Sequence, residues 1–279
     1  MTGYLSLATV LLVLTIVRLG AASGDDYYAN IDSSATNFAL KKQLQKLIYN
    51  HTVFTYDGVW TAMASIDKHL PGYPCNPNNA SYIPDIYSSY CWSPEKLSTG
   101  GECGSYSKEG DCYNREHSWP NSWFGGDTAS VAYTDLFLLY PSDGYVNNKR
   151  GNLPLGVVEP SAVTYKSTNG CLIGPCLAGT AGNYTGSCFE PPLFLKGDLA
   201  RTYFYISVAY MSIFTCCDEP AVTKWAIHPW EETILRQWHA VDAVDDIERA
   251  RNEVIYTNWQ HNRNPFIDHP EFVDQIADF

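Results

Sequence analysis

Apolar residues recur with a helical period in several separate stretches of the chain. Between Thr36 and Asn50 they stand three or four residues apart, and Thr36 or Asn37 is a suitable cap for the start of a helix. The spacing therefore predicts a helix at this point. The same period predicts further helices over 59–66, 225–239 and 245–256.

The stretch 197–210 is apolar almost throughout, with Arg201 placed among aromatic residues. A helix without a polar face is typical of a buried position, so we expect a core helix there. A continuous apolar run also fits a buried strand, and the sequence alone does not decide between the two.

Gly, Pro, Ser, Asn and Cys are frequent in the segments between these stretches. Residues 71–112 have the composition of an irregular excursion held by disulfides, and 152–192 that of loops and short strands. We expect a strand at the start of 112–125, and a short helix between a turn at Pro141–Gly144 and its end at Gly151. Together these features predict an α+β fold, a mostly helical mixed domain with small β-sheets and disulfide staples.

The amino terminus has the features of a secretory signal. Residues 5–17 form an apolar run that is too short to span a bilayer comfortably, and small residues follow it. We therefore expect a signal peptide over 1–23, a single domain over 24–279, and a secreted protein without membrane attachment after cleavage. A retained anchor is the alternative.

Nine cysteines, all outside the expected signal peptide, also favour export to an oxidising compartment. They allow up to four disulfides and one odd thiol, and their spacing leaves the connectivity open. Three Asn-X-Ser/Thr sequons are compatible with glycosylation in a eukaryotic secretory route. They begin at Asn50, Asn79 and Asn183.

The segment 112–125 contains the most suggestive chemistry, with Arg115, Glu116 and His117 in succession. Neighbouring side chains of a regular strand face opposite sides, so Glu116 and His117 share a site only if the strand ends or bulges there. His117 can accept a proton near neutral pH, and the oxygens of Glu116 and Asn147 are hard donors that suit Mg²⁺. A divalent cation beside a water-activating histidine suits the hydrolysis of phosphodiesters.

Arginine side chains are candidates for holding the phosphate, because a guanidinium can bind it through two parallel hydrogen bonds. The candidates are Arg115, Arg150 and Arg201. On residue types alone, an isolated Glu–His pair more often lies on the surface in contact with solvent, and Arg201 fits a structural role equally well.

The net charge of −12 opposes the binding of a polyanion, which relies on Lys and Arg contacts. The acidity is uneven, however. Residues 218–279 carry 13 Asp and Glu against 5 Lys and Arg, whereas 105–166 carry 7 against 5. A less acidic cleft on an acidic body is therefore compatible with the sequence.

Several ordered motifs resemble the endonuclease I family, one of the ββα-metal or His-Me finger nucleases. The resemblance spans nearly all of 36–272. It is carried by Asn114–Trp123, Asp135–Arg150, Ala200–Tyr205, Arg249–Asn252 and Asn262–Pro270.

By this resemblance His117 matches the general base of the family, while Glu116 and Asn147 match the ligands of one Mg²⁺ ion, for which Mn²⁺ is an expected substitute. The family also implies a ββα-metal finger embedded in the mixed fold. The implied activity is that of a secreted endonuclease with little sequence specificity, which cleaves DNA and often RNA and leaves 5′-phosphate ends. We expect it to act as a monomer.

The chain departs from the family pattern at three positions. Leu138 stands where His or Asn is frequent, Asn121 where Lys is frequent, and His261 where Gly is expected. The first two changes remove a polar neighbour of the site and a phosphate contact. They motivate an alternative function, a catalytically weak secreted binding protein on the same scaffold.

Overall fold

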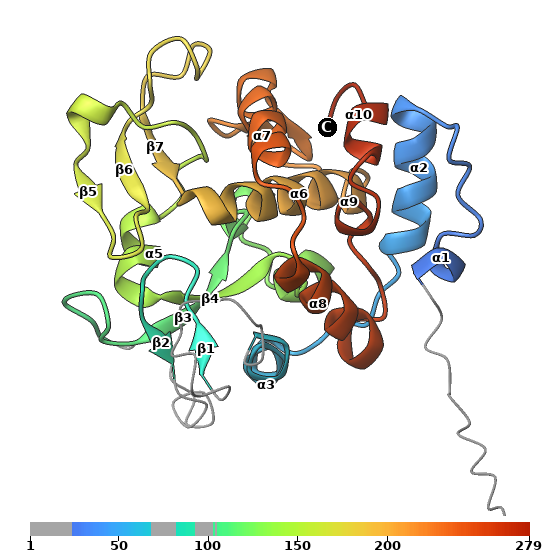
Figure 1. Cartoon of the computed structure of the whole chain (residues 1–279), viewed down its shortest axis with the longest axis horizontal. Coiled ribbons are helices and arrows are strands. Elements are labelled where there is room, and N and C mark those ends of the chain that lie inside the picture. The colour runs from blue at the N-terminus through green and yellow to red at the C-terminus, as the bar shows by residue number, and fades with distance from the viewer. Residues whose placement is uncertain (1–23, 68–81, 93–102, 104) are drawn as a thin grey trace, which may run out of the picture. The chain divides into compact units, whose positions relative to one another are not determined.

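The computed structural model describes residues 24–67, 82–92, 103 and 105–279 (Figure 1). The predicted signal peptide and the sequon at Asn79 lie outside these residues. The described residues before Ile31 and those from Ile31 to Phe279 belong to two separate units, and the short helix α1 (Gly24–Tyr27) belongs to the first. No helix in the described part of the chain is both long and apolar enough to cross a membrane.

The helix α6 (Leu193–Ala209) is the core element of the unit 31–279, and it confirms a helix rather than a strand at this stretch. Nearly all of its residues from Leu195 onward are buried, because other helices cover it on several sides. Those packed directly against α6 are α2 (Asn37–Ile48), α7 (Pro229–Val241) and α9 (Pro265–Asp268), as Figure 1 shows.

Two further helices agree with the predicted stretches 59–66 and 245–256. The helix α3 (Tyr56–Asp67) contains the periodic residues of 59–66, and α8 (Asp246–Val254) continues into a π-helical turn over Ile255–Trp259. The chain ends with the short helix α10 (Phe272–Gln275).

The strands form small antiparallel sheets rather than one large sheet, as the sequence predicted. The pair that matters for the site is β3 (Tyr113–His117) with β4 (Leu139–Asp143). The others are β1 (Ile83–Pro84) with β2 (Cys91–Trp92), β5 (Tyr165–Lys166) with β6 (Leu172–Pro175) and β7 (Ser187–Glu190), and β8 (Val222–Thr223) with β9 (Ala226–Ile227).

The short helix α5 (Gly144–Arg150) follows β4 without an intervening loop. The Asp143 side chain caps its start by accepting hydrogen bonds from the backbone N–H groups of Tyr145 and Val146, and Gly151 ends it with a positive φ of 54°. The predicted turn over Pro141–Gly144 is wrong, since Pro141 pairs with Arg115 inside β4. A proline lacks the backbone N–H donor but still has a carbonyl acceptor. The Pro141 carbonyl accepts a hydrogen bond from the backbone N–H of Ile86 at the outer edge of the strand.

Disulfides staple the loop-rich parts of the chain, as predicted. They join Cys103 to Cys112, Cys176 to Cys188, and the neighbours Cys216 and Cys217. Cys91 is also disulfide-bonded. The free thiol among the described residues is that of Cys171, which is buried.

The backbone conformation at His261 explains why Gly is expected at this position in the family pattern. His261 adopts a positive φ of 62°, the left-handed conformation that glycine tolerates best. Its Nδ1 lies 2.9 Å from the Tyr256 carbonyl, a local contact that accompanies the conformation. The sequon residues Asn50 and Asn183 are both exposed, so the structure leaves these acceptors accessible.

Candidate functional site

A cleft of about 270 Å³ opens between β3 and the second half of α5. The strand ends at His117, which is what a shared site for Glu116 and His117 requires. The cleft also contains Asn147 from α5, so the structure brings the three predicted site residues together. The full lining consists of Tyr56, Asn114, Arg115, Glu116, His117, Pro120, Asn121, Asn147, Asn148, Gly151 and Asn152.

The Glu116 carboxylate is buried and held by one of its two oxygens. Its Oε1 accepts a hydrogen bond from the Tyr87 hydroxyl at 2.9 Å and another from Nη1 of Arg150. No described residue donates a hydrogen bond to Oε2. Burial raises the pKa of the Glu116 carboxyl, and Arg150 and Tyr87 oppose that rise because both favour the charged form. The second oxygen is therefore available to a ligand.

The His117 ring has a defined orientation. Its Nε2 lies 2.9 Å from the carbonyl oxygen of Tyr133, and the ring stacks on that of Tyr133 at a centroid distance of 4.9 Å. A carbonyl oxygen can only accept a hydrogen bond, so Nε2 carries the proton in the neutral ring and Nδ1 keeps its lone pair. No described residue forms a hydrogen bond with Nδ1.

The surroundings of His117 keep it neutral. Burial lowers its pKa to about 4, the Tyr133 carbonyl opposes this shift, and the positive charges of Arg115 and Arg150 add to it. At neutral pH the ring is therefore neutral and Nδ1 keeps its lone pair, the form that a general base must have.

The Asn147 side chain is half-buried, and its amide forms no hydrogen bond with a described residue. Four other asparagines share the cleft with it, so neutral amides make up much of its wall. Among the described residues, no group of three or more His, Cys, Asp or Glu side chains is arranged to hold a metal ion. A cation in this cleft would therefore rely on one carboxylate, one amide oxygen and water, a set that Mg²⁺ accepts because it usually keeps several waters.

Arg115 lines the cleft but is largely committed to the protein. Its guanidinium carbon lies 3.3 Å from the centroid of the Tyr56 ring and 4.4 Å from that of Trp60, and Nη1 donates to the Tyr56 carbonyl. Oδ1 of Asp57, which is exposed, lies 3.9 Å from Nη1 of Arg115. Arg115 thus fixes the start of α3 against β3, and Tyr56 in turn stacks on His117.

Arg150 lies behind the cleft rather than in it. Its side chain is buried and donates to Glu116, to the carbonyl oxygens of His117 and Ser118 at 3.0 and 2.5 Å, and to the Tyr203 hydroxyl at 3.2 Å. The geometry therefore does not support the predicted phosphate contact. Arg150 instead holds the end of β3 and the Glu116 carboxylate in place.

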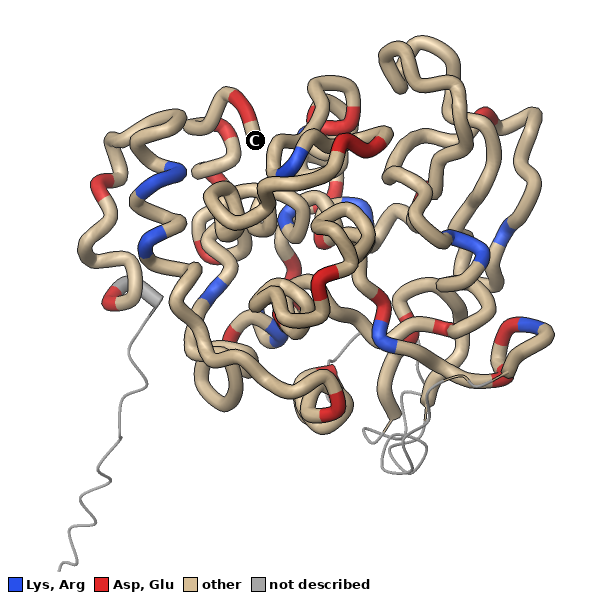
Figure 2. Tube along the Cα trace, turned by 180° about the vertical axis from the view of Figure 1, so that it is seen from behind, with Lys and Arg blue, Asp and Glu red and all other residues tan. Residues whose placement is uncertain are grey.

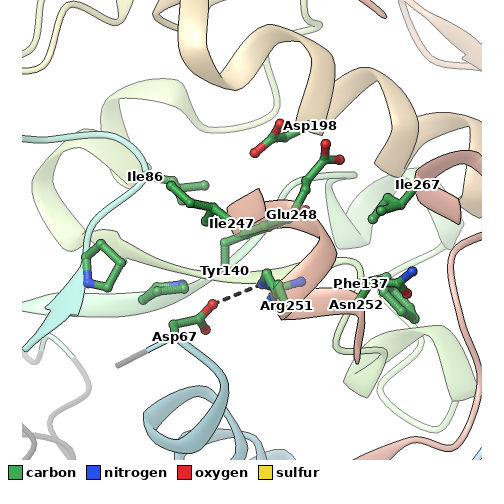
Figure 3. A pocket seen from close by; sticks show the side chains of 12 residues that line it. Asp67, Ile86, Phe137, Tyr140, Asp198, Ile247, Glu248, Arg251, Asn252 and Ile267 are labelled. Carbon is green, nitrogen blue, oxygen red and sulfur yellow. Dashed lines mark hydrogen bonds and ion pairs between the residues drawn. The ribbon is translucent and has the colours of Figure 1, made fainter. Parts of the chain in front are cut away.

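Arg201 is also placed outside the cleft. It is buried on α6, where Nε and Nη2 bind both oxygens of Glu248 and Nη1 donates to the Asp242 carbonyl. Glu248 and Asp198 lie at one edge of a separate cavity of only about 20 Å³ between α6 and α8 (Figure 3). Arg201 therefore has a structural role, the alternative that its aromatic surroundings had left open.

Residue patterns gave no indication of several groups that shape the site. Tyr87 reaches Glu116 from a loop 29 residues earlier in the chain, and no spacing rule joins the two. Tyr133 acts through its backbone carbonyl, which the residue type does not reveal. Asn121 stood out as a departure from the family pattern, and it does line the cleft.

Comparisons with known proteins agree with the family resemblance of the sequence. The family model described as Endonuclease I matches residues 36–271. A protein of Bacillus subtilis (strain 168) named "Extracellular ribonuclease" is 36% identical over 260 residues, which cover 91% of this chain and 79% of the relative. A protein of the same name from Bacillus amyloliquefaciens is 35% identical over 261 residues, covering 92% and 79%.

Proposed function

Because this chain belongs to the endonuclease I family, we propose that its cleft hydrolyses phosphodiester bonds in nucleic acid with the help of one divalent cation. The observation that carries the proposal is the set of free polar atoms in one cleft. Oε2 of Glu116, the side-chain amide of Asn147 and Nδ1 of His117 have no hydrogen-bond partner among the described residues. None of these atoms is among the buried unpartnered side-chain atoms of the described residues, so each can be reached by a ligand in the cleft.

In this proposal Glu116 and Asn147 hold the cation, with Mg²⁺ as the natural ion and Mn²⁺ as a substitute. When bound, the ion neutralises charge on the phosphate and on the leaving oxygen. Nδ1 of His117 takes the proton from the attacking water, while the Tyr133 carbonyl holds the ring in the required tautomer. The unit β3–β4–α5 supports the further proposal of a ββα-metal finger, since it has the required order of two antiparallel strands and a helix.

A water nucleophile determines which substrates and products we expect. Because the proposed base does not act on a ribose hydroxyl, the cleft should cleave DNA as well as RNA. The products should carry 5′-phosphate ends. The names of the two Bacillus relatives support RNA as one substrate and secretion as the destination.

The test is incubation of the purified protein with supercoiled plasmid and with single-stranded RNA, each with Mg²⁺ or with EDTA. We expect both substrates to be cut with Mg²⁺ and neither with EDTA, and end labelling should find 5′-phosphates. Binding without cleavage in Mg²⁺ and in Mn²⁺ would favour the alternative, a secreted binding protein on the same scaffold.

A further inference from the structure

Three half-buried tyrosines lie beside one another, one of them on the helix α5. The ring centroids of Tyr106 and Tyr145 are 6.4 Å apart, and those of Tyr145 and Tyr165 are 6.2 Å apart, both in edge-to-face arrangements. Nζ of Lys149 lies 5.3 Å from the centroid of the Tyr145 ring. We propose that this surface, the tyrosine platform, binds the unstacked bases of single-stranded nucleic acid. The inference rests on the proposed function and names the form of its substrate.

The fold holds the platform in place from both sides. A Cβ at Gly144 would lie 2.2 Å from Sγ of Cys103 and 3.3 Å from Cδ1 of Tyr106. Only glycine at this position therefore lets the segment with Cys103 and Tyr106 pack against the start of α5. The disulfide between Cys103 and Cys112 ties the same segment to the residue before β3.

On the other side, the Tyr165 hydroxyl donates to Glu109, which also accepts two hydrogen bonds from Thr168. The hydroxyls of Tyr106 and Tyr145 form no hydrogen bond with a described residue. Two of the three tyrosines thus have a hydroxyl group without a hydrogen-bond partner among the described residues. The disulfide and the contacts of Tyr165 hold the surface around them in place.

The platform adjoins the cleft through α5 itself. Successive helix residues are about 100° apart, so Tyr145 lies about 160° round the axis from Asn147, with Asn148 between them. Asn147 and Asn148 both line the cleft, whereas Lys149 is one turn after Tyr145 and on its face. A strand whose scissile phosphate is bound near Asn147 can therefore continue past Asn148 and reach Tyr145.

The distribution of charge favours stacking as a source of affinity. Among the described residues that line the cleft, Arg115 is the one Lys or Arg, and its guanidinium is buried against aromatic rings. Figure 2 shows the Lys and Arg positions dispersed over several elements, with acidic positions between them. Phosphate contacts alone are thus a weak basis for binding to a chain of net charge −12.

Around the platform the charges nearly balance. Lys149 and Lys166 are exposed, while the carboxylates of Glu109 and Asp143 both lie close enough to Tyr165 to interact with it electrostatically. Aromatic rings bind any base through its flat face, and this contribution does not depend on neutralising phosphates. In a duplex the base faces are covered by neighbouring bases, so the platform should select single strands.

The experiment measures binding by fluorescence anisotropy in EDTA, which separates it from cleavage. The probes are a labelled 12-nucleotide RNA and its duplex with the complementary strand. Tyr145→Ala should weaken single-strand binding about 5- to 100-fold, the range expected for one lost stacking partner, and should change duplex binding less than about twofold. Tyr145→Phe keeps the ring and should bind like the wild type.

Tyr184→Ala is the matched control, because Tyr184 is another half-buried tyrosine but stacks on Trp230 outside the platform. Tyr106→Ala is the second test variant if Tyr145→Ala melts at a lower temperature. Unchanged single-strand affinity in both platform variants would overturn the inference, as would an equal loss for the duplex. A wild type that cuts no nucleic acid in Mg²⁺ would instead refute the proposed function.

Discussion

The hydrogen bond from Tyr87 to Glu116 provides a sharp test of how the site is built. Tyr87 is buried, and its hydroxyl is 2.9 Å from Oε1 of Glu116, the oxygen that Arg150 also binds. With Oε1 held by two donors, Oε2 would meet the proposed cation in a fixed orientation. Tyr87→Phe removes one donor and keeps the ring, which packs on Phe189 at a centroid distance of 4.7 Å.

The size of the effect follows from the kind of hydrogen bond. A buried hydrogen bond to a charged group contributes about 1.5–3 kcal/mol, which corresponds to a factor of about 10 to 100 in a binding constant. Mutation of a residue that orients a metal ligand usually lowers the affinity for the metal by a similar factor. We therefore expect Tyr87→Phe to weaken Mn²⁺ binding about 10- to 100-fold in a calorimetric titration, and excess metal should restore most of the cleavage rate.

Tyr113→Phe is the matched control. Tyr113 is also buried, two residues before Arg115, but its hydroxyl has no hydrogen-bond partner among the described residues. We expect this variant to bind Mn²⁺ like the wild type. If Tyr87→Phe binds Mn²⁺ with wild-type affinity and only melts at a lower temperature, Tyr87 merely stabilises the fold and the reasoning is refuted.

Three further predictions concern protonation, thiols and the backbone. Burial lowers the pKa of His117 from 6.5 to about 4, so the folded protein is most stable above about pH 6.5 and loses this stability as the pH falls towards 4. The free energies of unfolding of wild type and His117→Ala, measured by denaturant titration, should therefore converge on acidification. A difference between the two that stays constant with pH would contradict this. Thiol titration should detect Cys171 only after denaturation, because it is buried, and a reactive thiol in the native protein would contradict its placement. His261→Gly should melt about 2–4 °C above His261→Ala, because both lose the contact with Tyr256 and only Gly adopts the positive φ without strain; equal melting temperatures would argue against that backbone conformation.

Helical period was a reliable guide to the fold, but composition was less so. The period identified α2 and α3, and the apolar run of α6 left helix and strand open because both bury such a run. Pro141 and its neighbours have turn composition, yet they form β4 because the partner strand β3 and the loop at Ile86 supply the hydrogen bonds. Such partners are distant in the sequence, so local composition does not reveal them.

The candidate site shows the same division. Asn147 and Arg150 are three residues apart on α5, a spacing that places two side chains on one face of a helix. In the structure Asn147 lines the cleft, whereas Arg150 is buried against Glu116. Helical spacing gives the direction of a side chain but not what covers it, and the covering strand β3 comes from another part of the chain. Tyr87 was missed for the same reason.

The most direct test of the account is single-turnover cleavage of DNA and RNA by His117→Ala, with a melting curve of the same preparation. His269→Ala is the control, a histidine outside the cleft that is hydrogen-bonded to Glu271. If Nδ1 of His117 takes the proton from water, His117→Ala should lose about 10²–10⁴-fold in cleavage rate while it still binds nucleic acid, and His269→Ala should lose almost nothing. A His117→Ala protein that melts normally and cuts within about threefold of the wild-type rate, far short of the loss expected for a missing base, would contradict the proposed mechanism.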